Sequence, residues 1–211
     1  MLSIIEQIIE NVPRDILTED ILMNLLEKSS NSRYGVIKRA IAKKELIHIR
    51  RGLYVMAKKY QRKNLNIFEL AQWIYGPSYV SFESALSYHG CIPESVYAVT
   101  SVCSKNAKEF RTPQGIFTYK RIPYPVLYLG VERVVSGNST FFMASPLKAI
   151  LDYVYAYRKN WQNISPLIKS LRIEEDTIYQ WNYDLLGEFK EQYKNYRVQR
   201  FLKGLEKDLN L

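Results

Sequence analysis

The chain has 211 residues, 47% of them apolar, which is enough for one large domain or two small ones with a proper core. It contains no run of 18 apolar residues, and its start lacks the basic segment and small-residue cleavage site of a signal peptide, so we expect a cytoplasmic protein without a membrane span. Cys91 and Cys103 stand apart without a CxxC motif, which argues against a zinc site and predicts reduced thiols in the core.

The formal net charge of +9 is concentrated in one segment. Twelve basic residues and a single acid, Glu45, lie between Lys28 and Lys63, so this segment carries +11 and the rest of the chain −2. A run of like charges is often only a solvated surface. Because this run coincides with the helix and hairpin described below, we favour nucleic-acid binding.

The first 57 residues have the pattern of three short helices and a hairpin. Apolar residues at helical spacing predict a first helix that ends at Asn11, before Pro13. Ile16-Leu17 is predicted to be a short extended piece. Thr18 is predicted to cap a second helix, which has two acids in its first turn and an apolar stripe ending at Leu26.

The third helix, predicted from about Asn31 onward, has two different faces. Four apolar residues form a stripe that we expect to be buried: Val36, Ile37, Ala40 and Ile41. The opposite face is small at its centre, where Gly35 and Ala42 lie, and basic at its flanks, where Lys38 and Arg39 lie. Such a face fits the major groove of DNA.

A hairpin follows the third helix. Leu46 to Arg50 and Gly52 to Val55 are β-prone runs around an Arg51-Gly52 turn, with two arginines at the tip. A basic helix followed by a short basic hairpin is typical of a winged helix-turn-helix, which we assign to residues 1–60. We predict that its DNA-binding residues are Ser32, Arg33, Tyr34, Lys38, Arg39, Lys43, His48, Arg50, Arg51 and Tyr54, although Arg33 falls on the core side of the helix.

Residues 58–66 form a polar linker to a second unit, 64–211. Helices are predicted over 67–75, over 82–89 with Ser81 as cap, and over 147–157 with Ser145 as cap, and strands over 79–80, 96–103, 115–122, 131–135 and 139–143. The last 47 residues are mainly helical and rich in tyrosine, which is more often core than interface. The predicted fold class is therefore α/β (α+β), with a small, mainly antiparallel sheet and C-terminal helices in the second unit.

The sequence offers few convergent polar groups for catalysis. It has two histidines and none of the HExxH, GxGxxG, GxxxxGK[ST] or GxSxG motifs, so we expect no enzyme, metal or cofactor. Ser81, Ser84 and His89 share one predicted helix, where a cap, a polar face and a histidine at the helix end are the favoured interpretation. Asp152 is interpreted as an exposed or capping helix acid.

Three blocks of the sequence resemble the AbiEi-type antitoxins, which are transcriptional regulators of the type IV (abortive infection) toxin–antitoxin systems. The blocks are Ile49 to Val55, Tyr79 to Glu94 and Ala144 to Asp152; they follow the family's order and fall within about the first 155 residues. Cys91 and Leu147 depart from the family pattern, which has leucine and a charged residue at these positions.

The resemblance implies a winged helix that binds inverted repeats in its own promoter and represses its operon. It also implies a C-terminal antitoxin domain that counters a nucleotidyltransferase-like toxin without a stable complex. Ser81, Ser84, His89 and Asp152 lie in the matching blocks, and the resemblance gives them no role. Two alternatives stay open: a nucleic-acid-processing enzyme targeted by the winged helix, and an interaction module whose tyrosine-rich helices bind a toxin directly.

Overall fold

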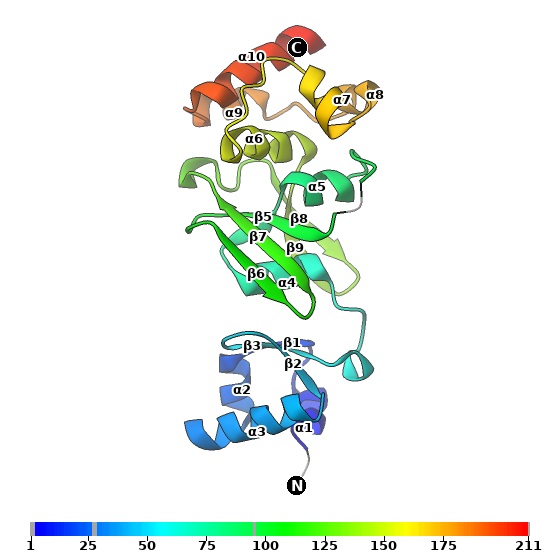
Figure 1. Cartoon of the computed structure of the whole chain (residues 1–211), viewed down its shortest axis with the longest axis vertical. Helices are drawn as coiled ribbons and strands as arrows, with labels where there is room; N and C mark the ends of the chain where they lie inside the picture. The colour runs from blue at the N-terminus through cyan, green and yellow to red at the C-terminus, as the bar shows by residue number, and fades with distance from the viewer. Residues whose placement is uncertain (1–2, 27–28, 95, 211) are drawn as a thin grey trace.

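The computed structural model describes residues 3–26, 29–94 and 96–210. The chain folds into a small N-terminal part and a larger part that follow one another along the long axis of the molecule (Figure 1). The small part contains a three-stranded antiparallel sheet and the larger part a six-stranded mixed sheet. The expected mixed α/β class is therefore confirmed.

The small part is built from three helices and three strands: α1 (Ile4–Asn11), β1 (Ile16–Thr18), α2 (Glu19–Leu26), α3 (Ser30–Ala42), β2 (Leu46–Arg50) and β3 (Leu53–Met56). Two side-chain helix caps occur among the described residues of the small part, and one of them was predicted from the sequence. Thr18 Oγ1 accepts a hydrogen bond from the Ile21 amide at 3.4 Å, as expected. Ser3 and Glu6 form a capping box at the start of α1, which the sequence reading did not identify.

The small sheet, in the order β1-β3-β2, has two apolar faces. Leu17, Leu46 and Met56 pack with α1, α2 and α3 in one core. The alternate residues Ile16 and Val55 belong to the core of the larger part instead. Because side chains alternate across a strand, the sheet is shared between two cores and holds the two parts together.

The larger part begins after η1 (Lys58–Tyr60) and has the elements α4 (Ile67–Ile74), β4 (Ser78–Val80), α5 (Phe82–Tyr88), β5 (Ala98–Cys103), β6 (Lys108–Thr112), β7 (Gly115–Arg121), η2 (Tyr124–Val126), β8 (Val131–Ser136), β9 (Ser139–Ala144), α6 (Pro146–Ala156), α7 (Ser165–Leu171), α8 (Glu175–Tyr179), α9 (Leu186–Gln192) and α10 (Tyr196–Leu209). The strand order is β6-β7-β5-β4-β9-β8. Three neighbouring pairs are antiparallel, whereas β5–β7 and β4–β9 are parallel. The sheet is thus larger than the small sheet that we expected.

Helices cover this sheet from two directions. In Figure 1, α4 lies on the side of the sheet toward the N-terminal part, and α5 and α6 lie on the other side. The C-terminal helices pack beyond α6, at the end of the molecule away from α3 (Figure 1). Within the described residues, no helix combines the length and the apolar character needed to cross a bilayer.

Candidate nucleic-acid interface

The outer face of α3 carries exposed positive charge. Ile37 and Ala40 are buried in the N-terminal core, as the apolar stripe predicted, and Val36 and Ile41 are half-buried beside them. Lys38, Arg39 and Lys43 are exposed. An amphipathic helix that buries one face presents the other outward, so all three cations are available to a ligand.

The start of α3 adds polar and aromatic side chains to this surface. Ser32 is exposed, and Tyr34 has 68% of its surface exposed although it is a large aromatic residue. Arg33 is half-buried, on the core side, as the helical spacing indicated. Asn31 belongs to α3, but its side chain lies outside the described ones. Tyr34 thus has no core role, which makes it a candidate for contact with a partner.

The hairpin divides its basic residues between two directions. His48 is exposed, with its ring 5.4 Å from that of half-buried Tyr54, and Arg51 is exposed in the turn. Arg50 is half-buried, and its Nη2 donates to the Trp73 carbonyl of α4 at 3.2 Å. A bulge between His48 and Arg50 breaks the alternation of β2 and explains why Arg50 turns toward the larger part.

An acid from elsewhere in the chain lies at the hairpin tip. The Glu19 amide donates to the Gly52 carbonyl at 2.9 Å, and Gly52 has a left-handed φ of +73° that favours glycine. Burial raises the pKa of Tyr54, and the neighbouring Glu19 and Tyr34 raise it further. The carboxylate of Glu19 lies beside Gly52, where its Oε2 would be 3.1 Å from a Cβ at that position, so the tip carries an acid that the local sequence does not indicate.

Asp152 occupies the centre of a buried polar cluster. The prediction that Asp152 is an exposed or capping acid is wrong, because its side chain is fully buried on α6. Its Oδ1 lies 2.8 Å from Lys148 Nζ and accepts from the Tyr193 hydroxyl at 2.9 Å. Its Oδ2 accepts from the Tyr79 and Ser81 hydroxyls, both at 2.8 Å. We call Tyr79, Ser81, Lys148, Asp152 and Tyr193 the buried cluster.

Lys148 is the only cation of the buried cluster and is fully buried as well. Its Nζ donates to the Val126 carbonyl and the Tyr193 hydroxyl, both at 2.7 Å. Burial lowers the pKa of Lys148, and the ion pair with Asp152 opposes this shift. Burial, reinforced by the charge of Asp152, raises the pKa of Tyr79 and Tyr193 well above the ordinary value. A closed cluster in which the charges satisfy one another indicates a structural role.

The other residues singled out in the matching blocks anchor different elements. Ser81 was expected to cap α5, but its side chain makes no cap bond there and donates to Asp152 instead. Ser84 Oγ donates to the Ala98 carbonyl at 3.2 Å and accepts from the Thr100 amide at 2.9 Å. His89 Nε2 pairs with the Ala144 carbonyl at 2.9 Å. The structure therefore brings Ser81 together with Asp152 in the buried cluster, whereas Ser84 and His89 contact other elements.

The sequence reading missed Tyr79, Lys148 and Tyr193 as partners of Asp152. One signal was available, because Lys148 and Asp152 are four residues apart on an otherwise apolar helix. Cys91 and Cys103 are buried free thiols, as predicted. Over the described ranges, no three His, Cys, Asp or Glu side chains gather as they would around a metal ion. No protein-family model matches this chain, and no curated protein matches it.

Proposed function

We propose that residues 1–60 are a winged helix-turn-helix that binds double-stranded DNA, with α3 as the reading helix and the β2–β3 hairpin as the wing. The observation that carries this proposal is the exposed basic face of α3, formed by Lys38, Arg39 and Lys43. Phosphate contacts from these side chains would supply most of the affinity, and the exposed Ser32 and Tyr34 would contact the groove.

We further propose that the protein is a repressor of its own promoter and the antitoxin of a type IV toxin–antitoxin system. The three sequence blocks that resemble AbiEi-type antitoxins support this assignment. The third block contains Asp152, which links α6 to Tyr79 of β4 and to Ser81, and its ion-pair partner Lys148. In this proposal the motif maintains the fold of the larger part, which counteracts a nucleotidyltransferase-like toxin.

A mobility shift of the purified protein on its own upstream DNA tests the DNA-binding proposal. We expect retardation of the upstream fragment at protein concentrations that leave a scrambled fragment of equal length free. Binding should weaken when the salt concentration is raised from 50 to about 200 mM, because phosphate contacts release counterions. Equal and weak binding to both fragments would mean that the basic segment attracts DNA only through its charge, without sequence preference. This result would contradict the repressor assignment.

Separate replacements of the two hairpin arginines test the wing. Arg51→Ala should weaken binding to specific and random DNA alike, by about fivefold at 0.15 M salt, since one phosphate contact contributes about 0.9 to the salt slope. Arg50→Ala removes the bond to the Trp73 carbonyl and should mainly lower the free energy of unfolding, by about 1–2 kcal/mol. Titrations with DNA and with urea measure the two effects. A strong loss of DNA binding in Arg50→Ala at unchanged stability would contradict this division.

A further inference from the structure

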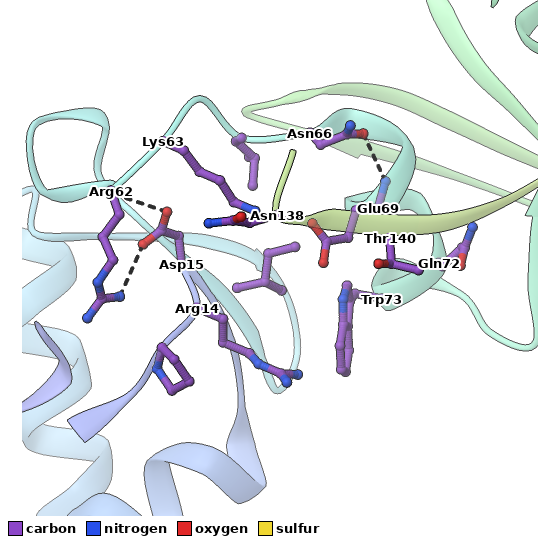
Figure 2. A pocket seen from close by; sticks show the side chains of 13 residues that line it. Arg14, Asp15, Arg62, Lys63, Asn66, Glu69, Gln72, Trp73, Asn138 and Thr140 are labelled. Carbon is purple, nitrogen blue, oxygen red and sulfur yellow. Dashed lines mark hydrogen bonds and ion pairs between the residues drawn. The ribbon is translucent and has the colours of Figure 1, made fainter. Parts of the chain in front are cut away.

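A cleft of about 580 Å³ lies between the two parts of the molecule (Figure 2). Its walls come from four segments: the connection between α1 and β1, the linker 62–66, helix α4, and the β8–β9 hairpin. The volume is in the range of sites that hold small molecules. A ligand in this cleft would therefore touch both the small part and the larger part.

One wall of the cleft is a flat aromatic surface. Trp73 of α4 is half-buried, and the guanidinium carbon of Arg14 lies 5.6 Å from the centre of its ring. Figure 2 shows the two side chains facing each other at one end of the cleft. A planar ring inserted between them needs about 7 Å, twice the normal contact distance, so exposed Arg14 has to move outward by about 1.5 Å.

The opposite end of the cleft contains an ammonium group. Lys63 Nζ lies 3.1 Å from Ser139 Oγ, and Figure 2 shows Asn138 beside it. Arg62 is neutralised by Asp15, whose carboxylate lies 3.6 Å from Nη1 and accepts from the Arg62 amide at 3.2 Å. Among the described residues, no carboxylate lies within ion-pair distance of Lys63 or Arg14. Both cations thus remain available to an anionic ligand.

Glu69 lies between these two ends. It is half-buried in the first turn of α4, where its amide is capped by Asn66 Oδ1 at 3.2 Å. Its carboxylate lines the cleft and has no hydrogen-bond donor among the residues described (Figure 2). A partly buried carboxylate without a donor favours a ligand that supplies hydroxyl or amine protons.

We propose that this cleft binds a mononucleotide. The base would stack on Trp73 beneath the Arg14 guanidinium, and the phosphate would bind at Lys63 and Asn138. The sugar hydroxyls or an exocyclic amine would donate to Glu69. The three chemical features follow one another along the cleft in the order in which a nucleotide presents its ring, sugar and phosphate. This site is separate from the α3 face and does not depend on the DNA-binding proposal.

Isothermal titration of the full chain with AMP, GMP, CMP and UMP tests the proposal. We expect at least one of them to bind with a Kd below about 100 μM, which is ordinary for a ligand of this size. Glu69→Gln and Arg14→Ala should each weaken that binding by about tenfold or more. Two matched exposed substitutions, Glu191→Gln on α9 and Arg111→Ala on β6, should leave it unchanged.

A Lys38→Ala/Arg39→Ala variant should retain nucleotide binding, because the α3 face does not line the cleft. Loss of binding in this variant would mean that the phosphate binds at α3 and not at Lys63, and would overturn the proposal. The proposal is also overturned if no nucleotide binds below about 1 mM, or if salicylate, an aromatic anion without sugar or phosphate, binds where all four nucleotides fail. Equal losses in the cleft variants and the matched control variants would count against it as well.

Discussion

Replacement of Lys38, Arg39 and Lys43 by alanine should lower the affinity for promoter DNA about 100-fold at 0.15 M salt. Each phosphate contact contributes about 0.9 to the slope of log K against log salt, which corresponds to about fivefold in affinity at this concentration. Three lost contacts therefore reduce the slope by about 2.7. A filter-binding or anisotropy series from 50 to about 300 mM salt measures both quantities.

The control for this triple variant removes the same charge elsewhere. Lys169, Lys203 and Lys207 are exposed and lie in the C-terminal helices, far from α3 (Figure 1). Their replacement by alanine should change the affinity less than about threefold, since only the long-range field of the protein is affected. Equal losses in the two triple variants would mean that net charge, and not the α3 face, determines binding.

The triple α3 variant also tests the division of labour between the two parts. Its substitutions are exposed and do not touch the buried cluster or the sheet of the larger part. If the protein is the repressor and antitoxin proposed above, cells that express this variant should stay protected from the proposed toxin, while repression of the promoter is lost. Loss of protection in a variant that is folded, as judged by its unfolding curve, would assign the proposed toxin-directed activity to residues 1–60.

Elements with a strong local signal were predictable from the sequence. The apolar stripe of α3 fixes its buried face through the helical period, and the β-prone runs around Arg51-Gly52 specify the β2–β3 hairpin. Strand β6 was missed because it has one apolar residue, Phe110, among charged neighbours, whereas β8, the other edge strand, was predicted from the hairpin turn that joins it to β9. The sequence of β6 therefore lacks the run of apolar residues by which β5 and β7 are recognised.

The surroundings of individual charged side chains could not be predicted from the sequence, because they are formed by segments that are far apart in the chain. Glu19 precedes the hairpin tip by more than 30 residues, and only the pairing of β1 with β3 brings it there. The sequence predicts Arg50 as a DNA-binding residue of the hairpin. In the structure, the bulge in β2 directs its side chain to the Trp73 carbonyl. Helical spacing could place Asp152 on α6, but its burial is determined by Tyr79 and Tyr193, which come from a strand and from the loop after α9.

The substitution Asp152→Asn should lower the free energy of unfolding by about 3–5 kcal/mol. Asparagine has the shape of aspartate, so the variant leaves no cavity, but it leaves the Lys148 ammonium buried without its counter-ion. Urea unfolding at pH 7 measures the loss. A loss below about 1 kcal/mol would show that the ion pair contributes little, as exposed ion pairs do.

The pH dependence of this variant should identify Lys148 as the source of the loss. Burial already lowers the pKa of Lys148, and removal of Asp152 removes the charge that opposes the shift. The unfolded chain then binds more protons than the folded one as Lys148 deprotonates, so the stability of Asp152→Asn rises with pH toward the ordinary lysine pKa of 10.5. We expect the difference from the native chain to shrink between about pH 7 and 9.

A neutral version of the buried cluster separates its structural role from any chemical one. Lys148→Met combined with Asp152→Asn removes both charges while the Tyr79 and Ser81 hydroxyls keep an acceptor. Because a buried ion pair can be replaced by uncharged groups of similar volume at little cost, the double variant should recover most of the lost stability, and the pH dependence should disappear. If the cluster has only a structural role and the antitoxin proposal is right, this variant should also protect cells from the proposed toxin. A stable double variant that fails to protect them would instead give Lys148 or Asp152 a role beyond the fold.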